Sequence, residues 1–178
     1  MTELVHLLRP TNAKDTTGQE IATWTKYLSI MSRVTPISGR ELINSLLLQS
    51  EVSYKLNFPY YPAVESDHRV LIPLDHTTIA EALDDSEVGV DVADYTAFSL
   101  KGLDFYVLVD SEFMKVTSGQ GTSTLTVTRG QLGTSAAAHT TGKVIVNFAQ
   151  LEIKNVVNVN QARVETELLC GHLGNFNA

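Results

Sequence analysis

The chain has 178 residues, a hydrophobic fraction of 43% and a formal net charge of −7. This length suits one domain, or a small domain that carries an insertion, and the apolar content is enough for a real core. No apolar run approaches the ~20 residues of a membrane helix, and the first ten residues lack the apolar stretch of a signal peptide. We therefore expect a soluble protein, made in the cytosol, with no membrane partner.

The acidic balance also bears on nucleic acid as a partner. Lys and Arg gather in no patch, which disfavours tight binding to a phosphate backbone. An acidic wall beside moving DNA would carry the same sign of charge, because repulsion keeps a polyanion off it. Charge alone does not separate these two readings.

The first part of the chain is predicted to be mostly extended. A short strand ends at Pro10, the polar residues 11–20 make a hairpin-like reversal, and a second strand, Tyr27–Val34, closes before Pro36. Trp24 is interpreted as a core anchor, with a recognition role as the alternative, because an indole ring brings a large area to bury.

The segment that follows predicts a helical piece and then more strands. Ser38 with Glu41 forms a capping pair ahead of apolar residues at helical spacing, which predicts a short helix over 40–49 within a long loop. Apolar residues alternate along 51–58, as in a half-buried strand. A short buried strand, 70–72, is expected to end at Pro73.

Residues 73–146 read as a self-contained β-rich unit. Three runs of β-branched and apolar residues, Phe105–Val109, Glu112–Thr117 and Thr124–Arg129, meet across Gly/Ser-rich turns. The stretch 76–85 predicts a short helical turn and 87–92 another strand.

The last part of the chain predicts a hairpin. Two alternating runs, 151–157 and 163–170, are separated by an Asn-rich turn. Strands on each side of the central unit lack partners in their own segment, and unpaired backbone groups must be satisfied, so the two flanks should pair with each other.

The predicted fold class is therefore mainly all-β. About six strands would close a small β-barrel, or pack as a sandwich, with a long partly helical loop and an inserted small β-rich domain. The expected domains are a discontinuous one, 1–73 with 147–178, and an inserted one, 74–146.

Few residues suggest chemistry. Asp84, Asp85, Glu87 and Asp91 lack calcium-loop spacing and fit a solvated turn, whereas Asp110 and Glu112 fit either a turn or an acid–base pair on one strand face.

Other reactive residue types are equally uninformative. The five histidines have no metal-ligand spacing, and the single Cys170 fits a buried strand residue. Neither a nucleophile elbow nor a phosphate loop is present. We expect no enzyme, no metal and no cofactor.

Several strings together resemble a known family. DTTGQEIATW, RVTPISGRE, SEVSYKLNF, DHRVLI and FAQLEIKNVVNVNQARVETELLCGHL are similar to the phage head–tail joining family, which comprises head-closure or stopper proteins. Two departures are an Asn57–Tyr61 stretch in place of an arginine-aromatic pair, and the insertion after Val70–Ile72. The inserted unit resembles a β module recurrent in phage virion proteins, through VDSEFMKVT and LTVTRGQLGTSAAAHTTG.

The resemblance implies a structural role in the virion neck. Members form a ring of identical subunits, here a hexamer or dodecamer, between a portal or adaptor on the head side and a tail terminator on the tail side. DNA would exit through the ring without tight binding, and the protein would be assembled in the host cytoplasm, with no cofactor or catalysis.

The apolar segment after SGRE is then a candidate subunit interface, with internal core packing as the alternative. Its residues are Arg40, Glu41, Leu42, Ile43, Leu46, Leu47 and Leu48.

Other functions remain open at this point. The chain could be a monomeric binding or decoration module of the virion that uses the inserted unit to hold a surface or glycan, or a ring protein of the tail-terminator type. A hydrolase built on Asp110 and Glu112 is an outlier.

Overall fold

A computed structural model describes residues 2–14, 20–37, 52–98, 105–158 and 164–172. The chain divides into two compact units. Unit 1 consists of Met1–Ile72 with Gln150–Ala178, and unit 2 of Pro73–Ala149. None of the helices in the described ranges has the length and apolar content to cross a membrane.

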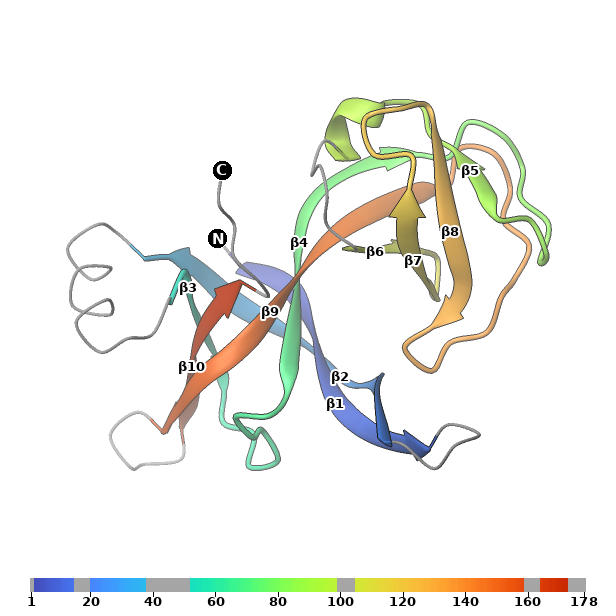
Figure 1. The fold of residues 1–178 in the computed structure, drawn as a ribbon. Helices are drawn as coiled ribbons and strands as arrows, with labels where there is room; N and C mark the ends of the chain where they lie inside the picture. Colours follow the sequence, from blue (N-terminus) through green and yellow to red (C-terminus); the bar gives the residue numbers. More distant parts are fainter. Residues whose placement is uncertain (1, 15–19, 38–51, 99–104, 159–163, 173–178) are drawn as a thin grey trace. The chain divides into compact units, whose positions relative to one another are not determined.

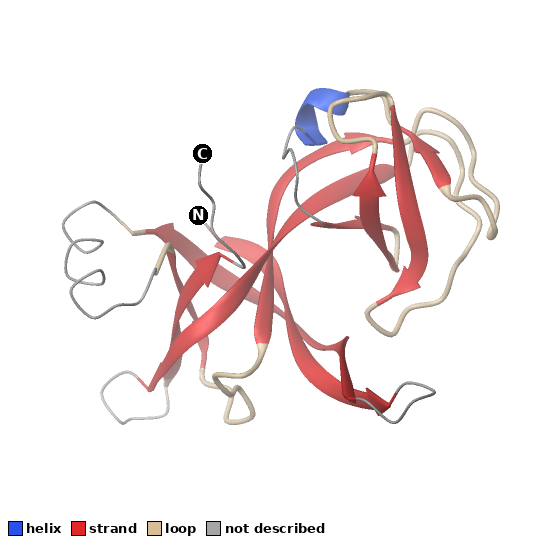
Figure 2. Cartoon of the chain, viewed as in Figure 1, coloured by secondary structure: helices blue, strands red, loops and turns tan. Residues whose placement is uncertain are grey.

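Strands make up almost all of the regular structure (Figures 1 and 2), so the all-β prediction is confirmed. The short 3₁₀ turn η1 is the one helical element within the described ranges. The elements are β1 (Thr2–Lys14), β2 (Glu20–Pro36), β3 (Tyr54–Pro59), β4 (Arg69–Thr78), β5 (Gly89–Asp91), η1 (Tyr95–Phe98), β6 (Phe105–Val109), β7 (Glu112–Ser118), β8 (Thr124–Gln131), β9 (Val144–Asn158) and β10 (Glu165–His172).

Six strands follow one another in a closed ring. The order of hydrogen-bonded neighbours is β10-β3-β2-β1-β4-β9, and β9 also pairs with β10. The remaining strands continue from β9 in the order β6-β7-β8-β5. Residues from both ends of the chain therefore pair with each other, as the unpartnered strands of the sequence require.

The hairpin of β1 and β2 is longer than predicted. It pairs Thr2 with Arg33 at one end and Lys14 with Glu20 at the other, so β1 does not stop at Pro10. A proline fits in a strand where its missing N–H is not needed. The pairing of β1 with β4 covers only His6–Leu8, which leaves one edge of β1 without a neighbouring strand at Pro10.

The strand predicted at 70–72 is also longer. β4 runs from Arg69 to Thr78 and passes through Pro73. Its pairing with β1 ends at Leu71, so the missing N–H of Pro73 costs no bond to β1. As a result, β4 continues from unit 1 into unit 2 without a break, and β9 returns in the same way.

The core of unit 1 is mainly aliphatic and comes from its strands. The predicted alternation along 51–58 is confirmed, because Val52, Leu56 and Phe58 are buried. The predicted final hairpin is confirmed as well, with β10 antiparallel to β9 and, on its other side, to β3. Cys170 is buried there, and burial raises the pKa of its thiol to about 12.

The core of unit 2 has its own set of buried side chains. The three strands predicted there match β6, β7 and β8, and the short strand matches β5. The helical turn expected over 76–85 is wrong, because its first residues end β4 and Ile79 and Leu83 form isolated β-bridges. The buried cluster consists of Ile79, Leu83, Val90, Val92, Ala97, Phe98, Phe105, Val107, Val109, Met114, Val116, Leu125, Val127 and Ile145.

Two further expectations concern single segments. Trp24 is only partly buried, so the core-anchor interpretation is wrong. Its ring lies under the guanidinium of Arg69, 3.9 Å from the ring centroid, on the hairpin of β1 and β2. The helix predicted over 40–49 lies outside the described residues.

Candidate functional site

The densest group of charged side chains in the described structure lies in unit 2. Glu112, the first residue of β7, is 1% exposed and forms a two-pronged ion pair with Arg129 of β8, with both N–O distances 2.8 Å. His139 lies 2.9 Å from Glu112 through Nε2 and 3.0 Å from Asp110 through Nδ1. Lys143 completes the group with a 2.8 Å bond to Asp110. We call these five residues the Glu112 cluster.

Backbone groups satisfy the remaining hydrogen-bonding capacity of Glu112 and Arg129. The Glu112 carboxylate accepts the N–H groups of Gly130 and Ala137, both at 3.0 Å. The Arg129 guanidinium donates to three carbonyl oxygens, those of Asp84 (2.8 Å), Glu87 (2.8 Å) and Ala137 (2.6 Å). The pair thus ties two loops, 84–87 and 130–139, to the sheet.

Local backbone geometry explains the residues around the pair. Asp110 has a φ of 51° in the turn between β6 and β7. Asp adopts this left-handed conformation more readily than most other non-glycine residues. Gly130 has a φ of 61°, and a Cβ there would lie 3.2 Å from the backbone nitrogen of Ala136. The positive φ and the close approach of the backbone both favour glycine at this position.

The protonation state of Glu112 follows from its contacts. Burial alone would raise the pKa of this carboxyl, but hydrogen bonds from Arg129 and His139, and from two backbone N–H groups, outweigh burial and lower it to about 2. The cluster therefore holds charges that compensate each other.

This arrangement is unsuited to acid–base chemistry. A general base should have a pKa near the working pH and should reach a substrate proton, whereas Glu112 is buried with its oxygens fully engaged. The acid–base reading of Asp110 and Glu112 is thus not supported by their geometry. The predicted turn is confirmed for Asp110, and the cluster holds the neighbouring loops in place.

The acidic run predicted around Asp84 can also be placed. Asp84 accepts the N–H groups of Ser86 and Glu87 at 2.7 Å, and these bonds lower its pKa. Asp84 and Asp85 are exposed, so the solvated-turn reading of the acidic run is confirmed there.

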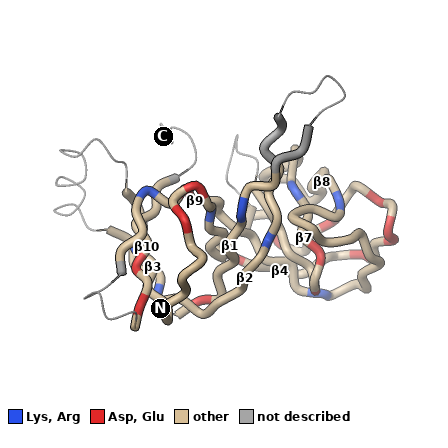
Figure 3. The backbone as a smooth tube through the Cα atoms, turned by 90° about the horizontal axis from the view of Figure 1, so that it is seen from below, with Lys and Arg blue, Asp and Glu red and all other residues tan. Residues whose placement is uncertain are grey.

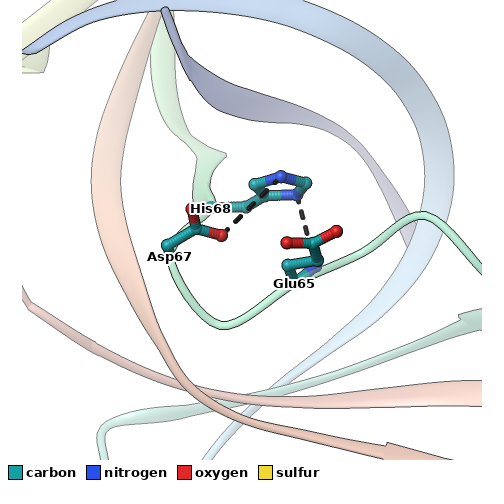
Figure 4. A group of neighbouring side chains, drawn as sticks. All are labelled: Glu65, Asp67 and His68. Carbon is teal, nitrogen blue, oxygen red and sulfur yellow. Dashed lines mark hydrogen bonds and ion pairs between the residues drawn. The ribbon is translucent and has the colours of Figure 1, made fainter. Parts of the chain in front are cut away.

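One loop of unit 1 brings together three side chains that could bind a metal ion. Glu65, Asp67 and His68 offer ligand atoms within 4.8 Å of one another (Figure 4). The Nδ1 atom of His68 is already used, since it lies 2.9 Å from the Tyr27 hydroxyl and accepts the N–H of Glu65 at 3.3 Å. Both carboxylates are exposed, so these contacts describe a loop held on β2 rather than an enclosed metal site.

A groove of about 690 Å³ crosses β2, β3 and β10 of unit 1. Met31 and Val164 are among its lining residues, as are Lys55 and Glu167, which form a 2.7 Å ion pair. Ile37, the last described residue before position 38, also lines it.

The predicted interface residues have no described position. Arg40, Glu41, Leu42, Ile43, Leu46, Leu47 and Leu48 all lie within 38–51, outside the described residues. Sequence reasoning did not predict the Glu112 cluster or the groove. A signal for the cluster existed, because the two strings that carry the resemblance of the inserted unit, VDSEFMKVT and LTVTRGQLGTSAAAHTTG, contain Glu112, Arg129 and His139.

Comparison with protein families gives one match. Residues 1–86 match the family described as phage head completion protein. This stretch contains β1 to β4, that is, the whole Met1–Ile72 segment of unit 1 and the first residues of unit 2. A comparison with curated proteins gives no match.

Proposed function

Since residues 1–86 place the chain in the phage head completion protein family, we propose that it is one subunit of a ring in the head–tail connector. Members of this family are structural proteins, so the chain is a non-enzymatic protein of the head–tail region of the virion. The family match is the observation that carries the proposal. Closure of the head by this ring would be its task at the neck.

The fold supports this proposal through its ring of strands. Closing β10, β3, β2, β1, β4 and β9 on themselves leaves fewer open sheet edges, as in a small barrel. In the proposed organisation, residues 1–73 with 147–178 form the joining barrel, and 74–146 form an inserted β-rich domain. Such a subunit can present strands to identical neighbours around an axis.

The charge distribution supports a channel that DNA passes through. Acidic and basic residues are scattered along the described chain (Figure 3), and the whole chain has a net charge of −7. A ring multiplies this charge by the number of subunits, and the resulting potential repels a duplex from the wall. The proposed partners are a portal or adaptor on the head side and a tail terminator on the tail side.

The proposed subunit contact is the segment that contains Leu46 and Leu48. We expect the double substitution Leu46→Ser with Leu48→Ser to reduce head–tail joining at least ~10-fold, because contact residues lose buried apolar area. The measurement is the yield of infectious joined particles in cells infected with a phage that lacks the gene. The melting temperature of the purified variant should change by less than about 3 °C.

A matched control is Leu74→Ser, which removes an exposed leucine, 42% accessible, from the part of β4 that belongs to unit 2. It should join heads to tails normally. Normal joining by the double variant, together with a large drop in melting temperature, would assign Leu46 and Leu48 to the core instead.

A further inference from the structure

The loop between β3 and β4 carries an imidazole with one ring nitrogen bonded and the other open. The side chain of His68 is 10% exposed, and its Nδ1 atom lies 2.9 Å from the Tyr27 hydroxyl of β2. Within the part of the chain that the structure describes, no hydrogen bond reaches its Nε2 atom, which faces the Asp67 carboxylate at 3.8 Å. A ring nitrogen that is nearly buried and makes no hydrogen bond is suited to bind a metal ion.

Contacts from outside the loop fix the orientation of this ring. The Tyr27 ring packs edge-on against His68, with ring centroids 5.1 Å apart, and lies 6.5 Å from the ring of Tyr61. Within the loop, the backbone N–H of His68 donates to the carbonyl oxygen of Glu65 at 3.2 Å, which closes a turn. The imidazole therefore needs little rearrangement to present Nε2 to an ion.

Binding through Nε2 requires the ring proton to be on Nδ1. The Tyr27 oxygen can accept a bond from that proton, because the hydroxyl donates its own hydrogen to the carbonyl oxygen of Ala63 at 3.5 Å. The bond that Nδ1 accepts from the Glu65 N–H is longer, at 3.3 Å, and would be given up. The Tyr27 hydroxyl would then be the outer hydrogen-bond partner that metal-bound imidazoles almost always have.

Two carboxylates lie next to the open nitrogen (Figure 4). One ligand atom of each of Glu65, Asp67 and His68 lies within 4.8 Å of the other two. Ligand atoms about 2.1 Å from a tetrahedral ion are ~3.4 Å apart, so movements of up to about 1.5 Å would bring all three onto one ion. Both carboxylates are exposed, so such movements break no buried contact.

We propose that Glu65, Asp67 and His68 bind a zinc ion, with water in the fourth position. One imidazole nitrogen and two carboxylate oxygens suit Zn²⁺, whereas Mg²⁺ and Ca²⁺ prefer oxygen ligands alone. A site that keeps a position for water needs no enclosure, and it would hold the loop between β3 and β4 against β2. The spacing of the histidines does not predict this site, because the other two ligands are carboxylates of the same loop.

Titration of the purified chain with zinc sulfate in a calorimeter tests the site. We expect one Zn²⁺ per chain and a melting temperature that rises by at least ~3 °C at saturation, because an ion that binds only the folded chain stabilises it. The same concentration of Mg²⁺ should cause no such rise. Cys170 is buried, and His139 has a carboxylate on each ring nitrogen, so neither should compete for the ion.

Two variants each remove one ligand. Asp67→Asn keeps the size of a side chain that is 62% exposed, so it should fold normally and bind Zn²⁺ at least ~10-fold more weakly, since even a partner that only supports a ligand is worth about that much. His68→Gln should abolish binding, although the lost contact with Tyr27 can also lower the melting temperature without metal. The matched control is His76→Gln, which removes an exposed histidine that follows Asp75 and should bind as the parent chain does.

The outcomes decide this proposal independently of the proposed ring, because the purified chain is sufficient for every measurement. Binding of one ion that Asp67→Asn weakens, His68→Gln abolishes and His76→Gln leaves unchanged would support the site. No binding at ~1 mM Zn²⁺ would overturn it, because an ion that weakly held would add little stability. Binding that persists unchanged in Asp67→Asn and His68→Gln, or that is lost in His76→Gln, would overturn it as well.

Discussion

Unit 1 and unit 2 are both built from strands, but different interactions hold their loops. In unit 2, a buried carboxylate and guanidinium fasten two loops through charged and backbone hydrogen bonds. In unit 1, the described ion pairs are at the surface, as with Lys55 and Glu167. Its backbone is held instead by six strands that pair with one another in a closed ring. Unit 1 leaves apolar side chains uncovered, as a surface for contact requires.

This difference indicates that the two units have different structural roles. A cluster such as that of Glu112 fixes one arrangement of loops, because breaking it would leave a charge buried without a partner. Closing strands into a ring fixes a backbone and leaves its outer face available to other chains. The family match also covers β1 to β4, and none of the five residues of the Glu112 cluster lies within it.

The largest expected effect comes from breaking the central pair. Glu112→Leu leaves Arg129, whose side chain is 7% exposed, without its carboxylate, so we expect unit 2 to lose about 3–5 kcal/mol of unfolding free energy. Thermal unfolding followed by circular dichroism, with proteolytic fragments mapped by mass spectrometry, should show unit 2 opening before unit 1.

The matched control for this variant is Lys143→Ala. It removes an ion pair of the same cluster whose side chains are 47% and 42% exposed, and should cost less than about 1 kcal/mol. Equal losses in the two variants would mean that burial of the pair does not determine its contribution.

Acid should act on unit 2 through the same carboxylate. The pKa of Glu112 is lowered from 4.5 to about 2 in the folded chain, so its stabilising contribution is present above pH 4.5 and is lost as the pH falls towards 2. Denaturant unfolding of unit 2 between pH 7 and pH 2 measures this loss. In Glu112→Gln the slope below pH 4.5 should be shallower, and an unchanged slope would assign the acid sensitivity to other groups.

A smaller effect is expected on unit 1 when unit 2 is removed. The N–H of Ile79 donates to the carbonyl oxygen of Lys143 at 2.9 Å, so an Asn-Gly turn can replace residues 80–142 and join β4 to β9 as a hairpin. We expect the shortened chain to stay folded, with the melting temperature of unit 1 lowered by less than about 5 °C. Loss of the circular dichroism signal and rapid proteolysis would contradict the proposed inserted domain.

The strands of unit 2 were predictable because they are local. β6 occupies Phe105–Val109 as predicted, since a short apolar run between turn residues has few other ways to bury itself. The strand ends predicted at Pro10 and Pro73 are wrong for a physical reason. A proline ends a strand only where a neighbouring strand needs its missing N–H, and the sequence does not show which edge of a strand lacks such a neighbour.

The Glu112 cluster depends on contacts that are distant in sequence. Glu112 meets Arg129 and His139, 17 and 27 positions away, and only the pairing of β7 with β8 and the return of the following loop bring them together. The string from Arg129 to His139 carries part of the resemblance of the inserted unit, but the resemblance gives no physical reason for it. The structure supplies that reason, since Glu112 binds residues at both ends of the string.

The single hydrogen bond between Ile79 and Lys143 also bears on the order of events during folding. Residues 73–149 are contiguous, so unit 2 can form from contacts within one stretch, whereas β3 must wait for β10, whose partner residues Asn57 and Glu167 are 110 positions apart. Loop closure costs more entropy as the loop lengthens, and non-local pairing slows folding. Once unit 2 has formed, Ile79 and Lys143 are adjacent, and the loop between the two halves of unit 1 is effectively shortened. Unit 2 would thus speed closure of the ring of six strands.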